Sequence, residues 1–249
     1  MAEKGWWKVE NLMEHEKEVT KINNLHEMDK EGDFGSYRKV LKGERIESTS
    51  LASHNDLNPR QKIRFLNKLM SLDNNLRLDI IDVGCGMGFT SYELSKFYKN
   101  SNVTGVDVSS DAIKYAKNRF ENVEFICQGL EPTKPLLDQY DLIFCFEFYP
   151  FTRTNSIQVH KEYLNYFLSH LKDHGRLVIS LKWENHLSLY ENFDKIKREL
   201  HLFRFDLHTI PSSKLSSFLG NNYLTFLVDK VIRLMLKKNQ SKSIIISLK

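Results

Sequence analysis

The chain has 249 residues, of which 41% are hydrophobic, so it can bury one sizeable core with at most a small appendage. Lysine and arginine total 36 against 32 acidic residues, and a net charge of +4 is too small to indicate a nucleic-acid partner. No apolar run reaches the roughly 18 residues of a membrane-spanning helix, and the charged N-terminus lacks the apolar block of a signal peptide. We therefore expect a cytoplasmic protein without a membrane span.

Three cysteines are widely spaced and form no CxxC pair: Cys85, Cys127 and Cys145. This spacing argues against a zinc site and against a disulfide framework, so no metal is expected. Small buried thiols in a reducing compartment are the simplest interpretation of all three.

The first 70 residues are polar and are expected to form a helical extension, with one helix over Val9–Glu31 and a second beginning at Pro59. Two roles for this extension stay open. Trp6 and Trp7 close over a ligand as part of a lid, or they anchor the first helix on the domain. Tyr37 is a candidate substrate-binding residue in the same extension.

From Leu76 onward, short apolar runs alternate with helical segments, which indicates a parallel sheet with crossover helices. The expected strands are Leu78–Val83, Asn102–Val108, Val123–Cys127, Asp141–Phe146, Arg176–Leu181, Leu202–Ile210 and Ser243–Ser247. The expected helices are Thr90–Tyr98, Ser110–Phe120, Ser156–Leu171, Leu187–Leu200 and Leu224–Lys237. The sequence thus predicts an α/β fold over residues 71–249, with a doubly wound, mostly parallel sheet of seven strands.

The first of these strands ends in a glycine-rich turn that opens a helix. Gly84 and Gly86 permit a tight turn with positive φ, and the missing side chains let a ligand lie against the backbone. The spacing with Gly88 is GxGxG and not the GxGxxG of dinucleotide sites, and Asp82 lies two positions before the first glycine. Asp107 ends the second strand, where a carboxylate points into the cleft and can accept both ribose hydroxyls.

The DxGxGxG motif of residues 82–88, followed by Asp107, resembles the first two signature motifs of class I S-adenosylmethionine-dependent methyltransferases. The stretch Gly105–Ala116 is similar to the second strand and helix of that family. The resemblance covers residues 60–182 and implies a Rossmann-like domain with S-adenosylmethionine as cofactor. It implies that the motif contacts the aminoacyl part of the cofactor, that Asp107 binds the ribose, and that Val108 packs on the adenine.

The third strand departs from this family pattern. The family usually carries a Gly-Asp pair there, whose acid binds the adenine amine, whereas this chain has Gly129 at the position of the acid. Gln128, Gly129 and Leu130 are still expected at the cofactor. Gln128, Glu131 or the backbone around Leu130 can replace the missing contact.

The aromatic segment after the fourth strand borders the transferred methyl group in the resembling family. Phe146 is expected to line the cofactor or to pack in the core, and Glu147 or Tyr149 to orient a hydroxyl or amine. Arg153 is either a bidentate partner of a carboxylate or phosphate or a solvated loop residue. His160 is either a general base or a packing histidine.

These residues predict methyl transfer to an oxygen or nitrogen of a small polar metabolite or sugar derivative. The run from Tyr149 to Arg153 resembles methyltransferases of surface-polysaccharide and natural-product clusters. Two alternatives remain: an RNA or protein methyltransferase, and a non-catalytic binding subunit that keeps the fold. The glycine spacing disfavours an NAD-binding protein.

Overall fold

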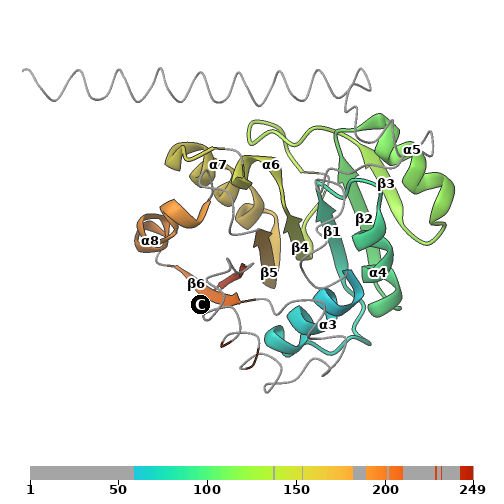
Figure 1. Cartoon of the computed structure of the whole chain (residues 1–249), viewed down its shortest axis with the longest axis horizontal. Coiled ribbons are helices and arrows are strands. Elements are labelled where there is room, and N and C mark those ends of the chain that lie inside the picture. Colours follow the sequence, from blue (N-terminus) through green and yellow to red (C-terminus); the bar gives the residue numbers. More distant parts are fainter. Residues whose placement is uncertain are drawn as a thin grey trace, which may run out of the picture.

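A computed structural model of the chain describes residues 59–136, 138–152, 154–181, 189–200, 202–209, 228, 231 and 242–248 (Figure 1). Several sequence-based expectations lie outside these residues. They are the extension before residue 59 with Tyr37, the loop residue Arg153, and all but two positions of the expected helix over 224–237.

The centre of the domain is a seven-stranded sheet with the order β3-β2-β1-β4-β5-β7-β6. Neighbouring strands from β3 through β5 pair in parallel, while β7 pairs antiparallel with both β5 and β6. The strands are β1 (Asp79–Val83), β2 (Asn102–Asp107), β3 (Glu124–Cys127), β4 (Tyr140–Phe146), β5 (Leu171–Leu181), β6 (Phe203–Thr209) and β7 (Lys242–Leu248). The expectation of a doubly wound, mostly parallel sheet is confirmed.

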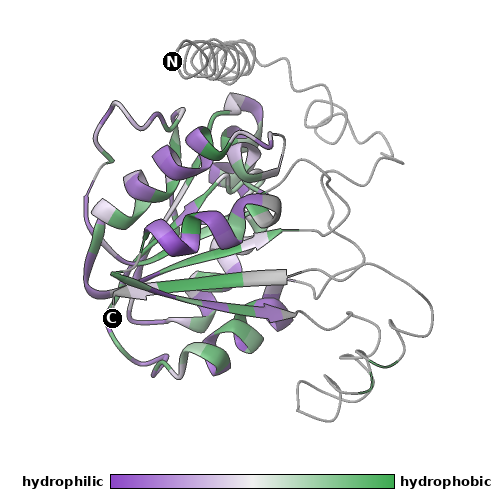
Figure 2. Cartoon of the chain, turned by 90° about the vertical axis from the view of Figure 1, so that its left-hand side faces the viewer, coloured by the Kyte–Doolittle hydropathy of each residue, from purple (hydrophilic) through white to green (hydrophobic). Residues whose placement is uncertain are grey.

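Helices cover both faces of this sheet. The first group lies on one face and consists of α3 (Pro59–Met70), α4 (Phe89–Phe97) and α5 (Ser110–Arg119). The second group lies on the other face and consists of α6 (Tyr149–Thr152), α7 (Ile157–Ser169) and α8 (Leu189–Glu199). The strands are largely hydrophobic and the helices carry polar outer sides (Figure 2), as expected for parallel strands buried on both faces. None of the helices among the described residues is long and apolar enough to cross a membrane.

Two serine caps set where the crossover helices begin. Ser109 lies directly before α5, and its side chain accepts a hydrogen bond from the amide of Ala112. Ser156 does the same for α7 through the amide of Val159. Such caps satisfy an amide that has no partner within the helix. The cap before α5 also fixes the exit of β2, where Asp107 is placed.

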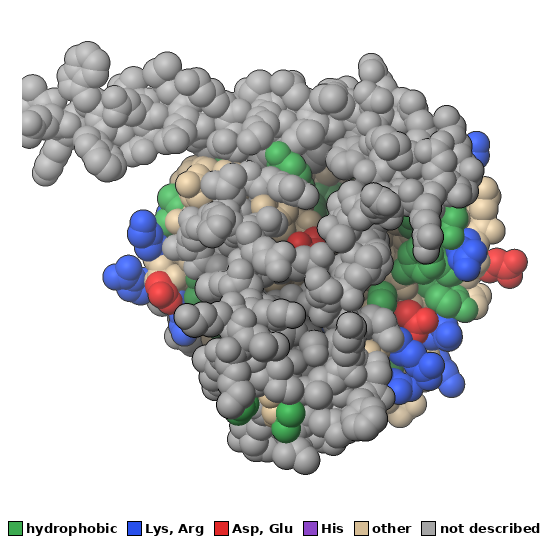
Figure 3. Space-filling view, viewed as in Figure 1, with side chains coloured by type: hydrophobic (Ala, Val, Ile, Leu, Met, Phe, Trp, Pro, Cys, Tyr) green, Lys and Arg blue, Asp and Glu red, His purple; other side chains and the backbone are tan. Residues whose placement is uncertain are grey.

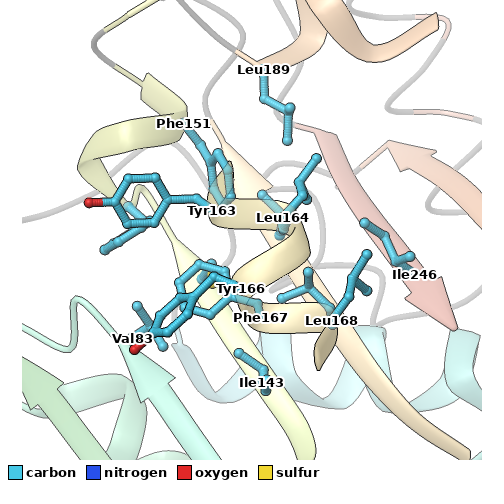
Figure 4. Close-up of a cluster of buried hydrophobic side chains, with 14 of the residues drawn as sticks. Val83, Ile143, Phe151, Tyr163, Leu164, Tyr166, Phe167, Leu168, Leu189 and Ile246 are labelled. Carbon is cyan, nitrogen blue, oxygen red and sulfur yellow. The ribbon is translucent and has the colours of Figure 1, made fainter. Parts of the chain in front are cut away.

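The alternating side chains of the strands fill two cores. The larger core lies under α7, where Phe151, Tyr163 and Phe167 pack over strand residues such as Val83 and Ile143 (Figure 4). The second core lies on the opposite face, under α3 and α4, and contains these residues of α3: Ile63, Leu66 and Met70. The helix α3, which the sequence assigned to the N-terminal extension, is thus part of the packing of the sheet.

Two elements differ from the sequence-based prediction. The fifth strand begins at Leu171, not at Arg176. Tyr140 of β4 pairs with Leu171 and Leu142 pairs with Arg176, so the turn-like residues of β5 between these two pairs are accommodated by a shift in register. His174 has a φ of 66°, so a bulge allows pairing to continue past residues that normally end a strand. The aromatic segment after β4 contains the short helix α6, which was not among the expected helices.

Candidate functional site

The glycine turn after β1 is held tightly against β2. Its three glycines, Gly84, Gly86 and Gly88, have φ values of 71°, 54° and 79°, which are left-handed conformations that favour glycine. The amides of Gly84 and Cys85 donate to the carbonyl of Val106 at 2.8 and 3.0 Å. The loop therefore turns sharply at the carboxyl ends of two parallel strands, which is the edge where open α/β sheets bind ligands.

Asp107 ends β2 with its carboxylate turned toward this loop. Its Oδ2 accepts a hydrogen bond from the amide of Gly86 at 2.7 Å, and its Oδ1 accepts one from Ser109 at 2.9 Å. The residue is only 9% exposed, and burial raises the pKa of its carboxyl group against the opposing effect of these amides. The position agrees with the expectation from sequence, and the amides orient an acceptor group beside the bare backbone.

Asp82 lies deeper, on the face of the sheet covered by α3 and α4. It is 1% exposed, and Ser91 Oγ of α4 donates a hydrogen bond of 2.6 Å to its Oδ2. Burial raises the pKa of Asp82 to about 7, the charge of Asp107 adds to this, and Ser91 and Lys62 oppose it. Sequence reasoning missed Ser91 because a serine in the first turn of a helix is ordinarily read as a local feature.

The segment after β3 continues the site beside Asp107. The amide of Gln128 donates to the carbonyl of Asp107 at 3.0 Å, which brings Gly129 next to the end of β2. Leu130 is buried, and its carbonyl accepts a hydrogen bond from Tyr163 at 3.0 Å. The expected neighbourhood of Gln128, Gly129 and Leu130 with the half-buried Val108 is consistent with this geometry. Glu131, by contrast, pairs with exposed Lys134 at 2.8 Å.

The exit of β4 carries backbone strain at a position that the sequence assigned to chemistry. Glu147 has a φ of 54°, which is uncommon for a residue with a side chain, and its amide donates to the carbonyl of Ser180 at 2.9 Å. Such strain clusters at binding and catalytic positions because the surroundings must enforce it. The half-buried Phe146 and Tyr149 flank this residue within the same segment. Their roles and that of Glu147 stay predictions.

Phe148 is a site residue that the sequence did not single out. Its ring packs edge-on against three aromatic rings of α6 and α7, and its Cδ2 lies 3.4 Å from where a Cβ of Gly84 would stand. It therefore forms a wall beside the first turn of the glycine loop. Because Phe148 lies in a loop, no periodic pattern in the sequence predicts this contact.

His160 lies in a packed position on α7. Its side chain is 0% exposed, its ring centroid is 6.1 Å from that of Phe151, and Asn192 Nδ2 is 3.2 Å from its Nδ1. Burial lowers the pKa of His160 to about 4, so the ring is neutral at pH 7. The geometry favours the packing alternative that the sequence left open, and a role as general base stays a prediction.

The three cysteines differ in exposure. Cys145 is buried and Cys85 half-buried, but Cys127 is exposed, so the expectation of three buried thiols is wrong for Cys127. Within the described residues no group of three histidine, cysteine, aspartate or glutamate side chains is arranged to hold a metal ion.

The fold and this edge define a methyltransferase-type domain: a seven-stranded sheet with an inserted antiparallel strand, a glycine loop after β1 and acids at the ends of β1 and β2. A family model described as a methyltransferase domain matches residues 74–246. The chain therefore belongs to this methyltransferase family.

Individual relatives share shorter stretches. A malonyl-[acyl-carrier protein] O-methyltransferase of Acetivibrio thermocellus is 39% identical over 77 residues, which are 30% of this chain and 27% of that protein. The mitochondrial ubiquinone biosynthesis O-methyltransferase of Saccharomyces cerevisiae is 27% identical over 61% of this chain and 50% of its own length. The chain thus spans about half or less of the length of these curated relatives.

Solved structures repeat the fold over most of the chain. A magnesium protoporphyrin IX methyltransferase from Synechocystis with bound S-adenosylhomocysteine has a TM-score of 0.59 at 13% identity, and covers 92% of this chain and 99% of its own. The plantazolicin methyltransferase in complex with S-adenosylhomocysteine has a TM-score of 0.57 at 17% identity, and covers 93% and 99%. At these identities the likeness confirms the Rossmann-like fold expected from sequence.

Proposed function

We propose that this chain transfers a methyl group from S-adenosylmethionine to an oxygen or nitrogen of a small polar molecule. The observation that carries the proposal is the pairing of the glycine loop at residues 84–88, which is bare of side chains at Gly84 and Gly86, with the carboxylate of Asp107, oriented beside it by two amides. The loop would let an adenosyl amino acid lie against the backbone, and the carboxylate would accept two ribose hydroxyls. S-adenosylmethionine would supply an activated methyl group on its sulfonium.

The residues around this site would divide the work. Asp82 and the glycine loop would hold the aminoacyl part, Val108 and the 128–130 segment the adenine, and Phe146 the region near the sulfur. Glu147 and Tyr149, at the exit of β4, are the proposed residues for orienting the acceptor and for moving its proton. Because direct displacement needs collinear atoms, positioning rather than acid–base chemistry would supply most of the acceleration.

The small-molecule substrate class rests on several lines of support. The relatives above are named O-methyltransferases, and the structural neighbours are named for plantazolicin and magnesium protoporphyrin IX. The described lysine and arginine side chains visible in Figure 3 lie in separate groups at the margins of that face, without forming a stripe. A sugar-derived acceptor, substrate roles for Arg153 and Tyr37, and a cytoplasmic location stay predictions.

Isothermal titration with S-adenosylmethionine and S-adenosylhomocysteine tests the cofactor. We expect saturable binding of both with one site per chain, whereas the absence of heat would refute the proposal.

Labelled-methyl transfer tests the acceptor class. The protein is incubated with methyl-labelled S-adenosylmethionine and, separately, with a small-metabolite extract, with total RNA and with protein. Label in the small-metabolite fraction is the expected result. Label confined to RNA or protein would favour the macromolecular alternative, and binding without transfer to any fraction would favour the non-catalytic one.

A further inference from the structure

A buried asparagine interrupts the apolar side of α8. Leu189 (Figure 4) and Ile196 of this helix belong to the larger core, and Asn192 lies between them on the same side of the helix, at 7% exposure. A polar side chain in a buried apolar contact is costly unless its hydrogen bonds are satisfied. The hydrogen bonds that Asn192 forms therefore identify its role.

The side-chain amide of Asn192 joins α8 to the end of the segment that follows β4. Its Nδ2 donates a hydrogen bond of 2.7 Å to the carbonyl of Asn155, the residue directly before the N-cap of α7. The same nitrogen lies 3.2 Å from Nδ1 of His160. Because a carbonyl oxygen can only accept, the NH2 group of Asn192 faces both partners, and Nδ1 of His160 is an acceptor. The proton of the neutral ring is then on Nε2.

The segment after β4 is held by distant elements at both of its ends. At its start, the amide of Glu147 donates to the carbonyl of Ser180 in β5, and at its end Asn155 accepts the hydrogen bond from α8. The φ of 54° at Glu147 costs free energy and persists only where the surrounding structure enforces it. The hydrogen bond from Asn192 is one of the constraints that fix the path of this strained segment.

We propose that Asn192 is a positioning residue for methyl transfer, which fixes the acceptor side of the site through Asn155 and His160. The inference rests on the proposed function, in which Glu147 and Tyr149 at the start of this segment orient the acceptor. Methyl transfer needs the acceptor atom, the methyl carbon and the sulfur in line, so a small displacement of the segment lowers the rate. The glycine loop and the end of β2 stay in place, so the cofactor still binds.

The test uses Asn192→Asp, which keeps the shape of the side chain but removes both N–H donors, and Asn192→Ala, which adds no charge. Lys195→Met, on the exposed side of α8, changes the net charge by the same amount as Asn192→Asp and serves as the control. Three quantities are measured for each protein. They are the tautomer of His160 by NMR of its ring nitrogens, the affinity for S-adenosylhomocysteine by titration, and the rate of labelled-methyl transfer at saturating S-adenosylmethionine and small-metabolite extract.

We expect the wild type and Lys195→Met to carry the His160 proton on Nε2. Asn192→Asp should place a proton on Nδ1, since a carboxylate accepts where the amide donated. In both Asn192 variants the transfer rate should fall by roughly tenfold to a hundredfold, while the affinity for S-adenosylhomocysteine stays within about twofold of the wild type.

Three results would overturn the inference. A wild-type transfer rate in both Asn192 variants would mean that the asparagine only packs α8 against α7. Equal losses of rate and of affinity would mean that the variants disturb the whole domain and not the acceptor side. A proton on Nδ1 of His160 in the wild type would remove the hydrogen bond itself. The absence of transfer by the wild type would refute the proposed function and the inference together, so the two failures are distinguishable.

Discussion

The two ends of β1 carry aspartates in opposite environments. At the amino end, Asp79 shares Lys172 with Asp141 in a partly exposed ion-pair network, and the hydrogen bond from Lys172 lowers the pKa of Asp79. Near the carboxyl end, three residues later, Asp82 is buried and its pKa is raised to about 7. The ionised form of aspartate is thus stabilised at one edge of the sheet and destabilised at the other.

This difference separates a structural edge from a functional one. Asp82 and Asp107 are both buried, and neither forms an ion pair with any described residue, so each costs folding free energy when ionised. A protein retains such groups where a ligand with matching polar atoms compensates them. At the amino edge, by contrast, the carboxylates of Asp79 and Asp141 already have a partner in Lys172.

The largest expected effect is that of Gly88→Val, at the carboxyl edge of the sheet. A Cβ at this position would lie 2.6 Å from Phe125 Cζ and 2.9 Å from the Ala116 Cβ, and the φ of 79° is strained for valine. We expect a loss of about 4 kcal/mol or more in the free energy of unfolding, measured by urea denaturation. The matched control is Gly129→Ala, whose φ is not left-handed, and a loss there as large as in Gly88→Val would contradict the steric argument.

The second perturbation is Asp82→Asn, read out as a function of pH. The folded pKa of Asp82 is about 7 and its ordinary value is 3.8, so the native state holds more protons between these values than the unfolded state does. Stability of the wild type therefore falls as pH rises from about 4 to about 7, by at most about 4 kcal/mol from this group. Urea denaturation at pH 5 and pH 8 measures the free energy of unfolding of both proteins. That of Asp82→Asn should be higher, relative to the wild type, at pH 8 than at pH 5. Equal differences at the two pH values would contradict the raised pKa.

The third perturbation, Asp107→Ala, separates binding from folding. Loss of both carboxylate oxygens should weaken S-adenosylhomocysteine binding by roughly a hundredfold in titration calorimetry, because the proposed charge-assisted hydrogen bonds to the ribose would be removed. Asp173→Asn changes an exposed aspartate of β5 and serves as the control that keeps wild-type affinity. Wild-type affinity in Asp107→Ala would separate this carboxylate from the cofactor.

The sequence carries local signals for the carboxyl edge of the sheet. The glycines at 84, 86 and 88 follow β1 and the acid ends β2, and in the structure the amide of Gly86 donates a hydrogen bond to Asp107. The contributions of Ser91 and Phe148 were not predicted. One comes from a helix and the other from a loop, and only the packing of α4, α6 and α7 against the sheet determines which of their side chains reach the site.

The strand ends were harder to predict for a related reason. The clearly apolar run of β5 begins after Arg176, but pairing with β4 begins at Leu171, because the turn-like residues of β5 between these two positions bulge out of the pairing. Long-range pairing overrides local propensity at such places. The antiparallel insertion of β7 between β5 and β6 likewise depends on partners far away in the chain.

The smallest expected effect on stability comes from a substitution at the amino edge of the sheet. Lys172→Met should change the free energy of unfolding by about 1 kcal/mol or less, because its ion pairs are partly exposed and screened by salt. The folded pKa of Asp79 is lowered and that of Lys172 raised, so the contribution is present between their ordinary values of 3.8 and 10.5 and is lost outside that window. Urea denaturation at pH 3 and pH 7, with Lys114→Met on α5 as an exposed control, measures this contribution.

The affinity of Lys172→Met for S-adenosylhomocysteine should be unchanged, since the network lies at the opposite end of the strands. A tenfold loss of affinity in Lys172→Met would show that the two edges are coupled through β1 and that the division between them is wrong.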